Sequence, residues 1–280
     1  MHRSLKISIF DSLIISFNKF RNFFSMKVTL LQLDIEWNNP EANIEKAERL
    51  FMQNPDSDLY VLPEMWSTGF MTEPEGKLQR QDEDKAFLWM QMMSKRYQCA
   101  IAGSLAICSD DGKYRNRLFF VTPTHMYYYD KHHLFAYGRE DIFYECGNNH
   151  TIAEWKGVRF LLLTCYDLRF PVWSRYGIAG EYDAILYVAN WPQKRQTARD
   201  VLVRARAIEN QCYVIAVNRV GKDPSGDYIG GSCVIGPKGE YVLSDTENAE
   251  KSLKGILSMK QLSDYRLRFP ALADRDVLSK

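Results

Sequence analysis

The chain has no strong excess of charge of either sign and no spacing of residues that would hold a structural metal. Its formal net charge is +1, so its charge gives no reason to expect nucleic acid or an anionic membrane as a partner. The six cysteines form no C-x-x-C pair, and no histidines cluster at zinc spacing. We therefore expect no metal and no cofactor, and reduced thiols of a cytoplasmic protein rather than a disulfide framework.

Residues 1–25 lack the features of an ordinary leader. They have a basic start and an apolar stretch, but Asp11 interrupts that stretch and no small residues mark a cleavage site. The stretch is too short and too charged to span a bilayer, although it would suit an interfacial helix of a membrane-associated protein. We favour a misplaced start, with the natural beginning at Met26. With no internal repeat and no linker-like segment, residues 26–280 are predicted to form one domain.

From Met26 onward, strand-like and helix-like segments alternate. Asn39 is placed to cap the first helix and Pro40 to occupy its first position. Strands are predicted at 27–35, 58–63, 99–107, 158–164, 183–190, 212–220 and 254–260, helices at 38–51, 82–97, 171–178 and 198–211, and strand pairs within 115–131 and 230–245. This order predicts an α/β fold in which helices cover a mixed sheet.

Two charged residues follow predicted strands, at the position where α/β proteins carry their functional groups. Glu64 follows an apolar segment, and such a partly desolvated carboxylate suits general acid–base catalysis; the alternative is an acid in a surface loop. Lys131 would be a surface residue or, if it points inward beside a thiol, would lower the thiol pKa and stabilise an oxyanion. His132 and His133 would point to opposite faces of a strand, so we expect them to be structural.

Cys165 directly follows the apolar run 158–164 and precedes a predicted turn into a helix. A helix N-terminus and a nearby cation favour the reactive thiolate, and backbone N–H groups at such a turn, that of Tyr166 included, can hold an oxyanion. The alternative is a small buried residue at the end of a strand. No histidine is placed to partner this cysteine, so a carboxylate such as Glu64 would have to act as the base.

The stretches that contain these residues resemble a known family. "LPEMWSTGF", "YDKHHLF" and "CYDLRFPVW" are similar to the Glu, Lys and Cys motifs of the nitrilase (carbon–nitrogen hydrolase) superfamily, in the same order. "YVANWP", "RARAIENQCYVIAVNRVG" and "YRLRFP" resemble its bacterial omega-amidase branch, which acts on amides of 2-oxo dicarboxylic acids. The resemblance covers about Met26 to Ala271. It implies a four-layer αββα sandwich and a homodimer or larger homo-oligomer.

The resemblance also implies catalytic roles at matching positions. The general base and acid, the oxyanion-binding cation and the nucleophile would be Glu64, Lys131 and Cys165. The superfamily has a second glutamate shortly after the lysine. Glu140 is the best match for it, and Glu145 and Asp141 are the alternatives.

A 2-oxo dicarboxylate amide needs a cation for its distant carboxylate. Arg169, Lys194 and Arg195 lie near the motifs, and an arginine can bind a carboxylate with two hydrogen bonds; surface charge is the alternative, above all for Lys194. Trp191 at a strand end would either wall the pocket or belong to the core.

The predicted reaction is hydrolysis of 2-oxoglutaramate or 2-oxosuccinamate to the 2-oxo acid and ammonia through a cysteine thioester, with water as the second substrate. The same catalytic groups would also serve a hydrolase of N-carbamoyl groups, short amides or nitriles. A non-catalytic scaffold is a further alternative, but it should have lost at least one of Glu64, Lys131 and Cys165, and all three are present.

Overall fold

Two six-stranded sheets and a two-stranded ribbon form the β-structure of the protein, in a computed structural model that describes residues 24–78 and 80–276. The first sheet has the order β14-β1-β2-β3-β4-β5 and consists of β1 (Ser25–Gln32), β2 (Leu59–Val61), β3 (Ala100–Cys108), β4 (Tyr114–Val121), β5 (Met126–Asp130) and β14 (Lys251–Ser258). The second has the order β13-β12-β9-β8-β7-β6 and consists of β6 (Ile152–Trp155), β7 (Val158–Thr164), β8 (Ala184–Ala189), β9 (Tyr213–Asn218), β12 (Cys233–Ile235) and β13 (Tyr241–Ser244). The ribbon pairs β10 (Val220–Asp223) with β11 (Gly226–Ile229).

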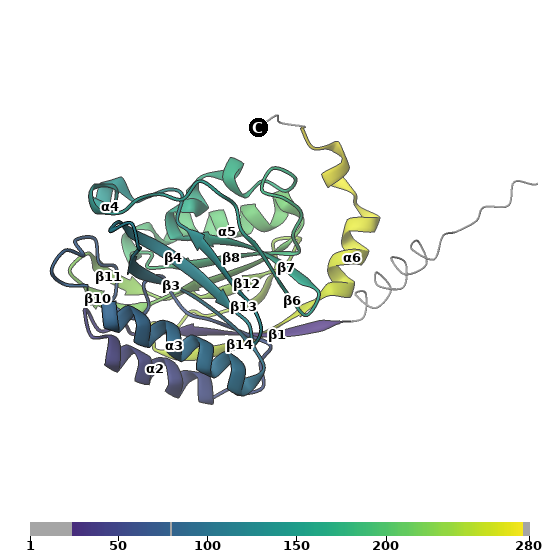
Figure 1. The fold of residues 1–280 in the computed structure, drawn as a ribbon. Coiled ribbons are helices and arrows are strands. Elements are labelled where there is room, and N and C mark those ends of the chain that lie inside the picture. The colour runs from purple at the N-terminus through teal and green to yellow at the C-terminus, as the bar shows by residue number, and fades with distance from the viewer. Residues whose placement is uncertain (1–23, 79, 277–280) are drawn as a thin grey trace, which may run out of the picture.

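Helices cover the outer faces of the two sheets. The α-helices are α2 (Pro40–Met52), α3 (Arg80–Tyr97), α4 (Glu140–Phe143), α5 (Gln196–Asn210) and α6 (Met259–Arg268), and the short 3-10 helices are η1 (Ala136–Gly138), η2 (Cys165–Arg169), η3 (Pro171–Ser174), η4 (Gln193–Arg195) and η5 (Ala271–Asp274). Apolar side chains of α2 and α3 pack on the first sheet, and those of α5 on the second. Figure 1 shows α2 and α3 on one side of the strands and α5 on the other.

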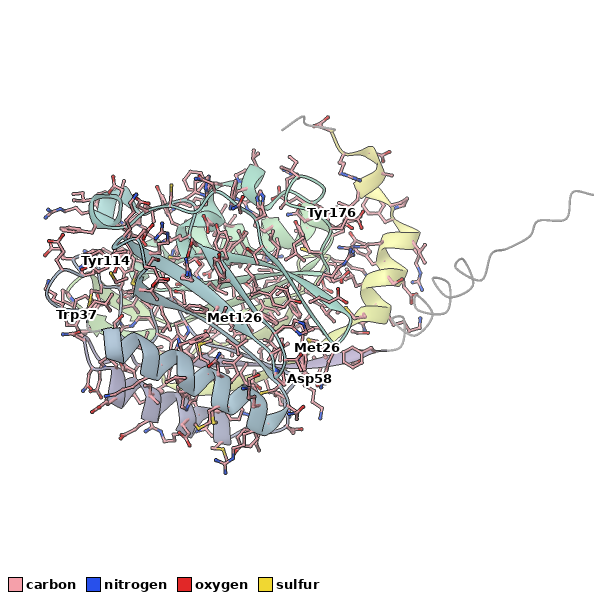
Figure 2. All side chains as sticks on the ribbon, in the orientation of Figure 1. Met26, Trp37, Asp58, Tyr114, Met126 and Tyr176 are labelled. Carbon is pink, nitrogen blue, oxygen red and sulfur yellow. The ribbon has the colours of Figure 1, made fainter. Side chains whose placement is uncertain are left out.

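Between the two sheets lies a continuous apolar core. Val28 and Leu30 of β1 and Phe120 of β4 belong to the same buried cluster as Leu162 of β7 and Val214 of β9. Side chains fill the space between the layers, with Met26 of β1 among them (Figure 2). Successive side chains of a strand point to opposite faces, and the central strands β3, β7, β8 and β9 are buried on both, so one face of each sheet meets the other sheet and the opposite face meets helices.

The architecture confirms the four-layer sandwich implied by the resemblance. The predicted mixed character of the sheet is confirmed, but the strands form two such sheets instead of one, each with a parallel centre: β1-β2-β3 and β7-β8-β9. The predicted N-cap of α2 is confirmed, with Asn39 Oδ1 accepting a hydrogen bond from Ala42 N at 3.3 Å. The sequence did not predict β6, the β10–β11 ribbon, α4 or α6.

The predicted N-terminal extension lies almost wholly outside the described residues. Pairing of β1 with β14 begins at Ser25, opposite Ser258, one residue before Met26. The boundary between extension and domain stays a prediction. Within residues 24–78 and 80–276, every helix is too short or too polar to cross a membrane.

Candidate active site

Four polar residues meet where strands of the two sheets end. Glu64 follows β2 and Lys131 follows β5 in the first sheet, whereas Cys165 follows β7 and Asn190 follows β8 in the second. Carboxyl ends of parallel strands share one edge of a sheet, and the two edges face each other here. The site therefore contains groups from both sheets.

Lys131 is the centre of a buried charge cluster. Its Nζ lies 2.8 Å from Glu64 Oε1 and 2.8 Å from Glu140 Oε2, and all three side chains are closed to solvent. Burial alone would lower the pKa of Lys131, but Glu140 and Glu64 outweigh burial and raise that pKa above its ordinary value. The ammonium therefore stays charged and can face a developing oxyanion.

Hydrogen-bond donors hold both carboxylates in place. Asn116 Nδ2 donates to Glu64 Oε1 at 2.8 Å and to Glu140 Oε1 at 3.0 Å. Phe135 N donates to Glu140 Oε2 at 2.7 Å, and Asn190 N donates to Glu64 Oε2 at 2.9 Å. Neither Asn116 nor Asn190 was predicted from the sequence. One signal was available: Asn116 interrupts the apolar alternation of β4.

Of the three candidates for the second glutamate, only Glu140 contacts Lys131 among the described residues. Glu145 pairs with Lys113 and, at 3.4 Å, with Arg115. Asp141 is exposed. The geometry favours Glu140, and its catalytic role stays a prediction.

Cys165 occupies a strained position at the turn between β7 and η2. Its φ of 43° lies in the left-handed region, which residues other than glycine seldom adopt. Residues held in such conformations cluster at functional sites. Burial and then Glu64 raise the pKa of the thiol well above its ordinary value, and Lys131 only partly opposes this shift. Lys131 does lower the thiol pKa, as expected of an inward-pointing lysine, but burial and Glu64 outweigh its effect. A neutral thiol beside Glu64 needs that carboxylate to take its proton at the moment of attack.

Asp167 connects the segment that holds Lys131 with the turn that holds Cys165. Its buried carboxylate accepts four hydrogen bonds from the two segments: from Thr164 N (3.0 Å), Tyr129 Oη (2.8 Å), His133 N (2.9 Å) and His133 Nδ1 (2.8 Å). Asp167 was not predicted from the sequence. An acid two positions after a candidate nucleophile is the only local signal for it.

His132 and His133 lie in the loop after β5, so the expected alternation on a strand was the wrong reason for a structural role. The ring of His132 stacks on Trp173 with centroids 3.6 Å apart, and that of His133 stacks on Phe170 at 3.8 Å. This packing supports the structural interpretation. No group of three or more metal-ligating side chains occurs in the described parts of the chain.

The predicted substrate-binding residues line one cavity with Cys165 and Lys131. The cavity has a volume of about 410 Å³, and its walls include Tyr166, Arg169 and Trp191. The guanidinium of Arg169 lies 5.0 Å from the centre of the Trp191 ring.

Arg195 and Lys194 also line this cavity. The Arg195 guanidinium lies 5.2 Å from the centre of the Phe135 ring and 5.0 Å from that of Tyr137. Within the described residues, neither Arg169 nor Arg195 has a carboxylate at ion-pair distance. Two stacked guanidinium groups therefore remain available to an anionic ligand.

The β10–β11 ribbon supplies a further wall of the cavity, including Tyr228. Arg219 and Asp223 form a pair at 2.9 Å whose side chains are both closed to solvent. Tyr228 Oη donates to Asp223 Oδ1 at 3.1 Å, and the Arg219 guanidinium lies 4.6 Å from the centre of the Tyr228 ring. This cluster was not predicted, because it depends on the fold of a ribbon that the sequence pattern did not reveal.

Comparisons with known proteins identify the family to which the chain belongs. The sequence matches the model of the carbon–nitrogen hydrolase family over residues 27–266. Omega-amidase YafV of Escherichia coli (strain K12) is 42% identical over 253 residues, which cover 90% of this chain and 97% of that protein. The 2-oxoglutaramate amidase of Bacillus subtilis (strain 168) is 31% identical over 251 residues, 88% of this chain and 96% of that protein.

Among solved structures, a CN-hydrolase superfamily protein from Xanthomonas campestris, which carries an arsenic adduct in its active site, superposes with a TM-score of 0.86. It is 36% identical and covers 92% of this chain and 99% of its own. The resemblance drawn from the sequence motifs is confirmed. The chain belongs to the carbon–nitrogen hydrolase family and is an enzyme that hydrolyses carbon–nitrogen bonds.

Proposed function

We propose that the protein is an omega-amidase that hydrolyses the terminal amide of 2-oxo dicarboxylic acid monoamides such as 2-oxoglutaramate and 2-oxosuccinamate. One observation carries the proposal: the cavity that contains Cys165 and Lys131 also contains two guanidinium groups, Arg169 and Arg195, without carboxylate partners among the described residues. An amide with a carboxylate at its other end matches both features. The names of the two relatives, an omega-amidase and a 2-oxoglutaramate amidase, support the same substrate class.

In the first half-reaction, Glu64 takes the proton of the Cys165 thiol while the sulfur attacks the amide carbon. Lys131 Nζ and the backbone N–H of Tyr166 hold the oxyanion of the tetrahedral intermediate. The Glu64 carboxyl then gives its proton to the amide nitrogen, the carbon–nitrogen bond breaks and ammonia leaves. A thioester remains on Cys165.

In the second half-reaction, water replaces ammonia. Glu64 takes a proton from the water, whose oxygen attacks the thioester carbon. The same oxyanion donors hold the second tetrahedral intermediate, and the carbon–sulfur bond then breaks. The sulfur of Cys165 recovers its proton from Glu64, so the enzyme returns to its starting state and the 2-oxo dicarboxylic acid is released.

Ammonia release from a panel of amides tests this function. The panel contains 2-oxoglutaramate, 2-oxosuccinamate, glutamine, asparagine, an N-carbamoyl amino acid and a simple nitrile, with Cys165→Ala beside the wild type. We expect release from the 2-oxo amides that is lost in the variant. Preference for another member would overturn the substrate class and leave the nucleophile in place, whereas full activity of Cys165→Ala would overturn the nucleophile.

We also propose a homodimer or larger assembly in the cytoplasm. Exposed apolar side chains support pairing through the helical faces: Val201 and Ile208 on α5, Leu267 on α6, and Phe269 directly after α6. All six cysteines are free, which suits a reducing compartment. Sedimentation equilibrium would measure the mass in solution, and a monomer at micromolar concentration would contradict the assembly.

A further inference from the structure

Asn116 of β4 makes contact with every charged member of the buried cluster. Its side-chain nitrogen donates to Glu64 Oε1 at 2.8 Å and to Glu140 Oε1 at 3.0 Å. Its backbone carbonyl accepts the N–H of Lys131 at 3.0 Å. The residue is completely closed to solvent. One asparagine thus spans both carboxylates and the strand end that carries the cation.

The orientation of this amide follows from its partners. Ionised carboxylates only accept hydrogen bonds, so the NH₂ group of Asn116 has to face Glu64 and Glu140, and a flipped amide would place its oxygen against both of them. Each of the two N–H bonds of the group can serve one carboxylate. No other uncharged side chain in the described cluster donates to both.

The charges of the cluster do not balance. Two carboxylates share one ammonium, and all three side chains are closed to solvent, so the ionised cluster carries one negative charge in excess. The pKa of Glu140 is raised, because burial and the charge of Glu64 outweigh Lys131 and the hydrogen bond from Asn116, which lower it. A carboxyl group that already carries a proton could not accept the proton of Cys165.

We propose that Asn116 is a positioning residue: its two hydrogen bonds hold the Glu64 and Glu140 carboxylates apart and orient Glu64 to accept the Cys165 proton. The inference rests on the base and nucleophile assigned in the proposed function. It assigns Asn116 no contact with the substrate. Its loss should therefore lower the rate of proton transfer and leave substrate affinity unchanged.

Two substitutions separate this role from packing. Asn116→Leu has the same branching and the same number of side-chain heavy atoms but donates nothing. Asn116→Asp has almost the same shape, yet an ionised carboxylate donates no hydrogen bond and a protonated one donates a single bond, so it cannot serve both glutamates. Asn210→Asp is the matched control, because Asn210 is equally buried and accepts a hydrogen bond from Tyr176 N at 2.8 Å, away from the cluster.

The test measures alkylation of Cys165 by iodoacetamide as a function of pH, with circular dichroism to establish that each variant is folded. Peptide mass spectrometry has to read the Cys165 site, because Cys146 is exposed and will react too. We expect the acidic limb of the profile to move to higher pH by about one unit in both Asn116 variants, because a lost hydrogen bond to an ionised carboxylate favours its protonation. The Asn210 control should keep the wild-type limb.

Steady-state kinetics give the second readout. We expect kcat to fall on the order of tenfold to a hundredfold, a part of the ~10²–10⁴ that general acid–base catalysis supplies, with KM unchanged. The proposal would be overturned if the Asn116 variants were folded and kept both the acidic limb of the wild-type alkylation profile and the wild-type kcat. Alkylation needs no substrate, so a wild type that ignores 2-oxo amides while the Asn116 variants still shift would refute the proposed substrate and support the role of Asn116.

Discussion

Lys131 Nζ lies 2.8 Å from Glu64 Oε1, and neither side chain is exposed to solvent. An ion pair in such a place contributes little net stability, because the cost of removing both charges from water offsets their attraction. Removal of one partner is different, since it leaves an uncompensated charge in the interior. The pair is therefore expected to reflect the demands of catalysis rather than those of folding.

Lys131→Met should abolish turnover and lower the free energy of unfolding by about 3–5 kcal/mol at pH 8, because two buried carboxylates lose their cation. The free energy of unfolding should depend differently on alkaline pH in the wild type and in the variant. The pKa of Lys131 is raised in the folded state, so its contribution is fully present below the unfolded pKa of about 10.4 and is lost as pH rises through the folded value.

Urea unfolding between pH 5 and pH 11 measures this dependence. The wild type should lose stability above about pH 10, and the variant should lack that loss. In the variant, the carboxylates are expected to take up protons, so its stability should rise as pH falls toward 5. Equal stability of the two proteins at pH 8 would contradict an uncompensated buried charge.

Arg169→Gln should raise KM for 2-oxoglutaramate about tenfold to a hundredfold, since a hydrogen bond to a charged group contributes about 1.5–3 kcal/mol. A neutral amide of the same length, without the distant carboxylate, is the matched control, and its KM should not change. Arg195→Gln, assayed in parallel, shows which guanidinium binds the anion. If KM were unchanged in both variants, neither guanidinium would bind the substrate carboxylate, and the proposed recognition of the substrate by a cation would be wrong.

Asp167→Asn should lower stability by about 1–3 kcal/mol and kcat with it, because the amide cannot accept all four hydrogen bonds without placing its NH₂ group against a donor. Urea unfolding and steady-state kinetics measure the two effects. His133→Phe removes the Nδ1 donor and keeps an aromatic ring that can stack on Phe170. It therefore distinguishes the effect of ring stacking from that of the hydrogen bond to Asp167. A variant of wild-type stability with full activity would show that Asp167 does not align the two segments.

Arg219→Met should destabilise the protein by about 3–5 kcal/mol, because it leaves Asp223 buried without its cation. The double variant with Asp223→Asn should recover part of that loss. KM is also expected to rise in Arg219→Met, since the wall formed by Tyr228 loses its support. Destabilisation without any change of KM would confine the pair to a structural role.

The strands and the first helix could be predicted because their signals are local. β7 is buried on nearly its whole length and appears as an apolar run, and α2 begins at a capping asparagine and a proline. The β10–β11 ribbon gave no such signal, since its alternation is interrupted by glycine and lysine and only its pairing defines it. Two separate sheets could not be told from one, because strand pairing joins distant segments.

The positions of the candidate catalytic groups were predictable, whereas their partners were not. Glu64, Lys131 and Cys165 follow strand ends that the pattern located. The contacts of Asn116 depend on which face of β4 meets the site, and that face becomes known only when the sheets pack. The effect of Lys131 on the thiol pKa could be predicted in direction, whereas the larger opposing effects of burial and Glu64 could not, because they depend on how the sheets pack.

The position of the candidate active site across the two sheets would make enzymatic activity a measure of folding. Asn116 lies in a strand of the first sheet and Glu64 and Lys131 follow its strands, whereas Cys165 and Asn190 follow strands of the second. A chain in which each sheet has formed but the two have not yet docked would show its full β-structure and hydrolyse nothing. In a refolding experiment, the return of ammonia release should therefore mark the docking of the sheets as an event distinct from their formation.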